Sequence, residues 1–174
     1  MLSIPTEETI SVEWFNACFA RAGLTGTVTG FDAERVGTGQ IGKCVRYTLR
    51  FSDQGELPAS VIGKFPSDDE NSRQTGVVLL NFLKEVRFYQ ELQHRIAIKT
   101  PRCYFAEIID QGPEFFLLLQ DLAPAQQGDQ LAGCSPQVAK AALAELVGLQ
   151  APAWCDQTLH ELKWLRDAET ATLV

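Results

Sequence analysis

Residues 36–65 read VGTGQIGKCVRYTLRFSDQGELPASVIGKF, and this stretch decides the fold. Apolar and polar residues alternate from Lys43 to Phe51, which is the period of two that is typical of a β-strand. A turn signal around Gly55 separates this run from a second apolar run at 59–65. The stretch therefore predicts two antiparallel strands with a glycine-rich turn before the first of them.

The three glycines of this turn, Gly37, Gly39 and Gly42, are spaced as Gly-x-Gly-x-x-Gly. In dinucleotide-binding domains this spacing opens a helix. Here a strand pattern follows it, so an oxidoreductase with that fold is a minor alternative. A glycine-rich turn between two strands instead covers nucleotide phosphates in kinases. Without a Cβ, the backbone N–H groups of such a turn can approach phosphate oxygens closely.

Lys64 lies on the second of these apolar runs and shares a strand face with the isoleucine two residues before it. A lysine that points inward from an apolar strand needs an anionic partner. Glu85 is a candidate, because it falls within the apolar stripe of a long helix predicted at 72–93 and would be costly to bury alone. The residues leave this pairing open, since Glu85 could equally contact Arg87 or Arg46, or extend to water.

The composition is that of one globular domain, with 174 residues, 45% of them apolar, and a net charge of −7. The negative charge argues against nucleic-acid or anionic-membrane partners. Residues 1–8 show no signal-peptide pattern, and the longest apolar run, 115–119, is too short to span a bilayer. We therefore expect a cytoplasmic protein. Its cysteines are odd in number and lack a Cys-x-x-Cys pair, which indicates reduced thiols rather than a disulfide or zinc framework.

The remaining pattern places helices around one sheet, which predicts an α+β fold with a five-stranded antiparallel sheet. A helix at 11–22 precedes the sheet, and the helix at 72–93 joins its third and fourth strands. A break at Ala151–Pro152 separates two later helices. The predicted strands are 26–36, 43–52, 58–66, 103–109 and 115–121, and the predicted later helices are 135–150 and 157–168.

Four motifs together resemble the N-terminal lobe of the phosphotransferase-type small-molecule kinases, which share the protein-kinase fold. They are GTGQIG at 37–42, KFP at 64–66, EVRFY at 85–89 and LLQDL at 118–122. The group includes the aminoglycoside phosphotransferase, choline kinase and ecdysteroid-kinase-like families. Residues 86–89 and APAW at 151–154 resemble the ecdysteroid-kinase-like branch most. The resemblance covers almost the whole chain.

This resemblance implies a nucleotide-binding lobe at 1–122 and the first helices of a truncated large lobe at 123–174. Lys64, held by Glu85, would bind the α- and β-phosphates of ATP. Cys44 and Ile62 would enclose the adenine, and the backbone of Gln120 and Leu122 would hydrogen-bond its edge. The loop over the phosphates would consist of Gly37, Thr38, Gly39, Gln40 and Gly42.

The chain departs from the family pattern after the predicted hinge. Phosphoryl transfer in these kinases uses a catalytic aspartate and metal-binding residues in the large lobe. None of the later aspartates here follows a histidine at the required spacing, and His160 is followed by Glu161. The resemblance therefore implies no catalytic residue and no metal ligand in this chain, with the ligands of Mg²⁺ beyond its end. These later aspartates are Asp121, Asp129, Asp156 and Asp167.

The expected function is the ATP-binding portion of a small-molecule kinase that acts on a hydroxyl of a metabolite, antibiotic or steroid-like compound. Alone it would be inactive, and it would meet its acceptor only if the missing half were supplied. The alternative is a non-catalytic module that docks a partner chain, since helices 135–150 and 157–168 would expose apolar faces and favour self-association. Cysteine chemistry at Cys134 is disfavoured, because no convincing base lies near it.

Overall fold

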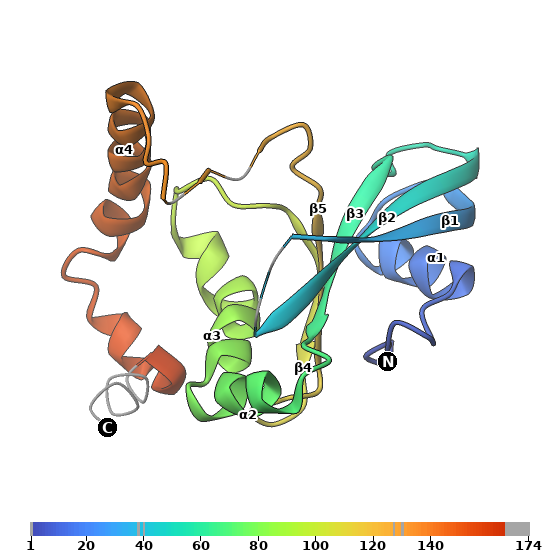
Figure 1. Cartoon of the computed structure of the whole chain (residues 1–174), viewed down its shortest axis with the longest axis horizontal. Helices are drawn as coiled ribbons and strands as arrows, with labels where there is room; N and C mark the ends of the chain where they lie inside the picture. Colours follow the sequence, from blue (N-terminus) through green and yellow to red (C-terminus); the bar gives the residue numbers. More distant parts are fainter. Residues whose placement is uncertain (1, 38, 40, 127, 130, 166–174) are drawn as a thin grey trace.

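The computed structural model describes residues 2–37, 39, 41–126, 128–129 and 131–165. Helices surround a single sheet, in an order close to the predicted one (Figure 1). The elements are α1 (Val12–Arg21), β1 (Thr27–Val36), β2 (Gly42–Asp53), β3 (Ser60–Pro66), α2 (Glu70–Val78), α3 (Asn81–Arg87), the π-helix η1 (Phe88–Leu92), the 3₁₀ turn η2 (Gln93–Arg95), β4 (Cys103–Ile108), β5 (Phe115–Gln120), α4 (Pro136–Ala153) and the 3₁₀ helix η3 (Gln157–Glu161).

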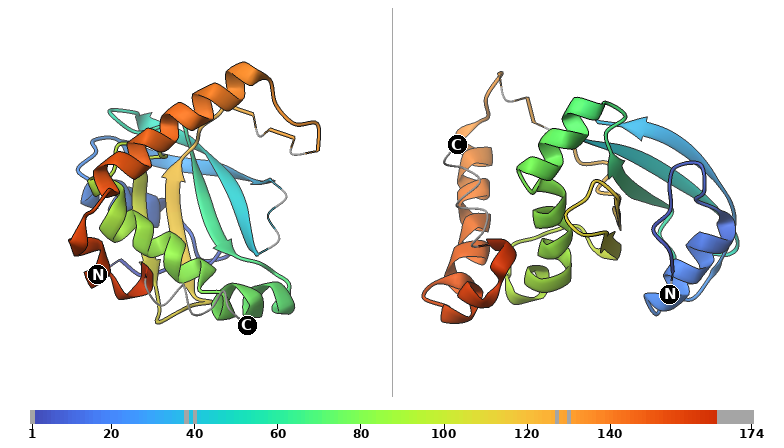
Figure 2. Two further views of the ribbon diagram at one scale, coloured as in Figure 1. Left: turned by 90° about the vertical axis from the view of Figure 1, so that its left-hand side faces the viewer. Right: turned by 90° about the horizontal axis from the view of Figure 1, so that it is seen from below.

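The five-stranded antiparallel sheet confirms the predicted α+β class. Its strand order is β1-β2-β3-β5-β4, and every neighbouring pair is antiparallel. Helix α1 covers one face of the sheet, while α2 and α3 cover the other, with α4 outside them (Figures 1 and 2). The sheet is therefore buried on both faces, which explains why the apolar run of β5 is continuous rather than alternating.

The two faces carry separate hydrophobic cores. Successive strand residues point to opposite faces, so β3 sends Val61 and Phe65 to the α1 side and Lys64 to the α3 side. The core under α1 is aromatic and includes Trp14, whose ring meets Phe116 edge to face at a centroid distance of 5.4 Å. The core under α3 consists of Phe82, Val86, Phe115, Leu117 and Leu119.

The prediction of a single long helix at 72–93 is wrong. Helix α2 ends at Val78, and Leu80 adopts a left-handed conformation with φ = 56° before α3 begins. Gly76 is buried against the Phe82 ring, so a Cβ built there would lie 2.3 Å from Cζ of that ring. Close packing of α2 across the start of α3 requires the chain to turn, and local periodicity carries no signal for such a contact. Val78, predicted inside the apolar stripe, is 61% exposed.

The expected break of the later helix at Ala151–Pro152 is also wrong, because α4 continues to Ala153. A proline inside a helix leaves the carbonyl four residues before it without its usual partner. Here that carbonyl belongs to Gly148, and it accepts a hydrogen bond of 2.8 Å from the backbone N–H of Ala97. The contact with a distant segment therefore compensates for the proline.

The final segment packs beside the α3 region. The predicted helix 157–168 is a 3₁₀ helix at 157–161 followed by one helical turn at 163–165, and residues 166–168 lie outside the described part of the chain. Trp164 is buried and its Nε1 donates to Oε2 of Glu91 at 2.7 Å. No helix within the described ranges is both long enough and apolar enough to cross a membrane.

Candidate functional site

Lys64 and Glu85 form an ion pair between β3 and α3. The Lys64 Nζ lies 2.6 and 2.7 Å from the two carboxylate oxygens of Glu85. The alternative partners are engaged elsewhere, since Arg46 binds Asp121 and Arg87 binds Glu91. The side chains of Lys64 and Glu85 are 27% and 31% exposed, so the pair is accessible rather than sealed in the core. A charged ligand can therefore reach the ammonium group.

The glycine-rich turn joins β1 to β2 directly beside this lysine. Val36 pairs with Cys44 across the hairpin, and Gly37 has φ = 77°, a conformation that favours glycine. A Cβ built on Gly42 would lie 3.3 Å from Cε of Lys64, so the backbone of the turn passes close to the lysine side chain. Two residues assigned to this loop by the family resemblance, Thr38 and Gln40, lie outside the described residues.

An open cleft of about 530 Å³ continues from the turn along the sheet to the end of β5. It brings together six of the residues predicted for the nucleotide site, while Lys64, Glu85 and Gly42 adjoin it without lining it. Glu85 instead borders a neighbouring hollow of about 420 Å³ with Lys84 and Trp164. The cleft is lined by Val36, Gly37, Gly39, Cys44, Arg46, Ile62, Pro101, Leu119, Gln120, Asp121, Leu122, Ala123 and Ala125.

Cys44 and Ile62 contribute to the apolar lining of the cleft. Cys44 is the register partner of Lys64, and Ile62 pairs with Leu119 of β5, so both occupy the α3-side face of the sheet. Burial raises the pKa of the Cys44 thiol, although the nearby Lys64 ammonium opposes this effect. At neutral pH Cys44 is therefore a neutral thiol, and it offers an apolar surface rather than a nucleophile.

The segment after β5 is held by the carboxylate of Asp121, to which the sequence alone assigned no role. Asp121 accepts from Arg46 Nε at 2.6 Å and Nη2 at 3.3 Å, and from Ser60 Oγ at 2.8 Å. It also accepts from the backbone N–H of Ala123 at 3.0 Å. Burial tends to raise the pKa of Asp121, but the hydrogen bonds, that from Arg46 foremost, hold it below its usual value. A sequence signal for this contact existed, because Arg46 lies on the same strand face as Cys44 and therefore needs an anionic partner there.

The backbone groups of the predicted hinge are partly occupied. The N–H of Gln120, the last residue of β5, donates to the carbonyl of Arg102, just before β4, at 2.8 Å. The carbonyl of Leu122 accepts from the N–H of Ala125 at 2.9 Å. The N–H of Leu122 donates no hydrogen bond to any of the described residues, so this donor of the predicted hinge has no partner among them.

Metal-binding side chains are not gathered in the part of the chain that the structure describes, where no cluster of three or more His, Cys, Asp or Glu could hold an ion. All five cysteines carry free thiols. Comparison of the chain with protein-family models and with curated proteins finds no match.

Proposed function

We propose that this chain binds ATP as the nucleotide-binding portion of a small-molecule phosphotransferase. The observation that carries the proposal is the accessible Lys64–Glu85 ion pair beside the glycine-rich turn. A lysine with its ammonium held by two carboxylate oxygens is positioned in advance, which reduces the entropic cost of binding phosphate. The motif resemblance to ecdysteroid-kinase-like and related kinases supports the same function.

The cleft suits a purine nucleotide in size and in lining. Its volume of about 530 Å³ lies within the range of small-molecule sites, roughly 300–1,000 Å³. Cys44 and Ile62 offer the base an apolar surface, and the N–H of Leu122 can donate to an acceptor on its edge. The phosphates would then lie under the turn at Gly37–Gly42, next to Lys64. Mg²⁺ would arrive with the nucleotide, and the proposal assigns it no ligand in this chain.

Phosphate transfer is not part of what the described residues would do on their own. The residues of the cleft bind and orient a nucleotide, whereas orienting an attacking hydroxyl needs a further carboxylate. Asp121, which lines the cleft, is bound to Arg46. It could orient an attacking hydroxyl only by giving up this ion pair. The acceptor, a small hydroxyl compound, would be bound by other parts of the protein.

A calorimetric titration of the whole chain with ATP and Mg²⁺ tests the proposal. We expect saturable binding that Lys64→Ala weakens by about tenfold or more, because the charge-assisted contact to phosphate is worth about 1.5–3 kcal/mol. Lys99→Ala is the matched control, since it removes an equally charged lysine that is 88% exposed and paired with Glu145 of α4. Absence of binding at millimolar ATP, or equal loss in both variants, would refute the proposal.

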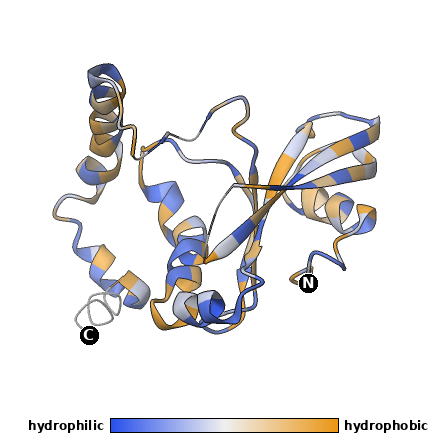
Figure 3. Cartoon of the chain, in the orientation of Figure 1, coloured by the Kyte–Doolittle hydropathy of each residue, from blue (hydrophilic) through white to orange (hydrophobic). Residues whose placement is uncertain are grey.

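A second candidate function is docking of another protein chain through α4. Helix α4 has no buried side chain. Hydrophobic residues recur along it (Figure 3). Val138, Leu143 and Val147 are 57%, 64% and 61% exposed. Such a surface favours association over solvation. This function and ATP binding involve different surfaces, so each can be tested without the other.

A further inference from the structure

The Lys64–Glu85 ion pair depends on a helix that is too short to fix its own position. Helix α3 has seven residues and continues into the five-residue π-helix η1. Isolated helices shorter than about 12–15 residues are marginal in water, so packing has to hold this one. Phe82 and Val86 bury one side of α3 against the sheet. The contacts at the two ends of α3 and η1 therefore decide where Glu85 lies.

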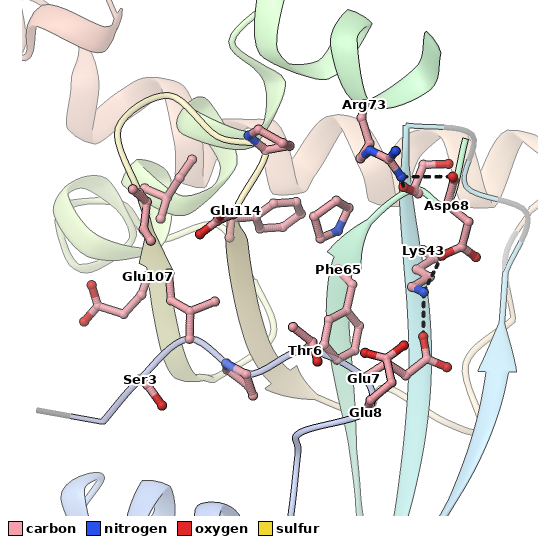
Figure 4. Close-up of a pocket in the computed structure, with 18 of the residues that line it drawn as sticks. Ser3, Thr6, Glu7, Glu8, Lys43, Phe65, Asp68, Arg73, Glu107 and Glu114 are labelled. Atoms are coloured by element: carbon pink, nitrogen blue, oxygen red, sulfur yellow. Dashed lines mark hydrogen bonds and ion pairs between the residues drawn. The ribbon is translucent and has the colours of Figure 1, made fainter. Parts of the chain in front are cut away.

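The beginning of α3 is fixed through α2. Arg73 of α2 lies at the edge of a cavity of about 810 Å³ beneath the N-terminal segment, residues 2–8 (Figure 4). Its Nη1 donates to the carbonyls of Ser67 and Asp68, at 2.9 Å each, and so ties α2 to the end of β3. Gly76 then packs against the ring of Phe82. The start of α3 is thus fixed relative to β3, the strand that carries the lysine of the pair.

The other end is held by the final segment, residues 154–165, which follows α4 and lies beside η1 and η2 (Figure 2). Asp156 pairs with Arg95 at 2.8 Å. Further along the chain, Trp164 donates to Glu91 at 2.7 Å. Residue numbers rise along the final segment while those of its partners fall, so the two segments run antiparallel. The final segment therefore covers η1 on the side away from the sheet.

Trp164 is the residue that links this segment to α3. Its side chain is buried, and its Nε1 donates to Oε2 of Glu91. The other carboxylate oxygen of Glu91 accepts from Nη1 of Arg87, the last residue of α3, at 3.0 Å. Trp164 and Glu85 also line the same hollow of about 420 Å³. The indole therefore fixes the end of α3 two residues from the carboxylate that holds the lysine.

We propose that Trp164 is a positioning residue of the nucleotide site, which holds the end of α3 so that Glu85 keeps the Lys64 ammonium in place for the phosphates. Trp164 does not line the cleft, and it acts on the site through Glu91 and α3. This inference rests on the proposed function and adds to it a residue outside the cleft. It makes the final segment part of the nucleotide-binding unit.

Calorimetric titration of the whole chain with ATP and Mg²⁺ tests the inference on Trp164→Ala. We expect the affinity for ATP to fall about three- to tenfold, within the range for residues that act on a site without contacting its ligand. Trp154→Ala is the matched control, because it removes the same side chain from the same segment at a position that is 79% exposed. The control should bind ATP as the wild-type chain does, and an equal loss in both variants would overturn the inference.

A double-mutant cycle with Lys64→Ala separates positioning from a merely structural role. If Trp164 acts through the Lys64 ammonium, Trp164→Ala should weaken ATP binding no further once that ammonium is absent. If Trp164 only stabilises the fold, its removal should weaken ATP binding by the same factor in both backgrounds. The second result would overturn the inference.

Trp164→Phe keeps the inference testable should Trp164→Ala release the final segment altogether. It retains an aromatic ring but removes the indole N–H, and it should still weaken ATP binding about twofold or more. Amide hydrogen exchange should become faster in residues 81–92 of both variants and stay unchanged in α1. Wild-type ATP affinity in both variants, or unchanged exchange in 81–92, would overturn this inference alone. If the wild-type chain binds no ATP, the proposed function fails and this inference fails too.

Discussion

At the scale of single residues, Lys64 and Glu85 combine a tight ion pair with partial exposure. Both side chains remain roughly one-third accessible, so the pair is only partly removed from water. Ion pairs of this kind contribute about 0–1 kcal/mol to stability. The geometry is therefore better explained by a need to hold the ammonium group in one place than by a contribution to folding.

Glu85→Leu is expected to separate these two roles. Because the unpaired Lys64 can be solvated, the free energy of unfolding should change by less than about 1 kcal/mol. The affinity for ATP should fall by about tenfold, because Lys64 loses its fixed position. Urea unfolding and ATP titration measure the two effects. A loss of more than about 3 kcal/mol with unchanged affinity would identify the pair as structural.

Asp121 is the opposite case, since its side chain is only 5% exposed and receives four hydrogen bonds. Its pKa is lower in the folded protein than in the unfolded chain. The resulting stabilisation is present above the unfolded pKa of about 4 and is lost as the pH falls through the folded value. Asp121→Asn should therefore cost about 2 kcal/mol at pH 7.

The pH dependence checks this assignment. The difference in the free energy of unfolding between the wild-type chain and Asp121→Asn should shrink as the pH falls below about 4. Denaturant unfolding at pH 7, 5 and 3 provides the measurement. Glu161→Gln, at the exposed end of η3 and away from Arg46, is the control, and its small effect should not change in the same way. A difference independent of pH would mean that folding leaves the pKa of Asp121 unchanged, so that its hydrogen bonds do not favour the carboxylate.

At the scale of elements, the break between α2 and α3 depends on one glycine. Gly76 has no room for a Cβ against the Phe82 ring, and the adjacent methyl of Ile41 would lie 2.8 Å from it. The break places α3 so that Glu85 faces Lys64 on β3. The contact of two helices therefore determines the geometry of the candidate site.

Gly76→Ala should accordingly destabilise the chain by about 1–3 kcal/mol, as overpacking of a buried position does. The matched control is Gly128→Ala, where a built Cβ meets nothing within 4 Å and the change should be within about 0.5 kcal/mol. Thermal and urea unfolding of both variants measure the difference. Equal stability of the two would show that Phe82 can move aside without cost.

At the scale of the whole molecule, α4 stands outside the layers formed by the sheet and its helices (Figure 2). It contacts the rest through few groups, chiefly the Gly148 carbonyl with Ala97 and the Lys99–Glu145 ion pair. Its remaining surface is largely exposed and partly apolar. We therefore expect the chain to self-associate through α4 at high concentration.

The double variant Leu143→Glu, Val147→Glu should abolish that association. The two positions are one helical turn apart on one face, so the variant places two charges on the same apolar surface. Val78→Glu is the control, since Val78 on α2 is 61% exposed, the same as Val147. Sedimentation velocity over a hundredfold concentration range measures the change. Persistent association in the α4 variant, or its loss in the control, would place the interface elsewhere.

The sequence by itself determined the sheet and the positions of the two charged residues of the ion pair. Alternation along 43–51 and the apolar runs around Lys64 and at 115–119 are local signals, because the side-chain period of a strand is set by its own backbone. The same reasoning put Glu85 on a helix near the sheet. It did not establish which basic residue Glu85 contacts.

The tertiary structure alone decided the break at Leu80, the Arg46–Asp121 contact, the continuation of α4 past Pro152 and the cavity beneath the N-terminal segment. Each of these depends on segments that are far apart in the sequence and meet only after folding. For example, Pro152 has no N–H to donate to the carbonyl of Gly148, and the N–H of Ala97 donates to that carbonyl instead. Periodicity describes one element at a time, whereas such contacts depend on the packing of one element against another.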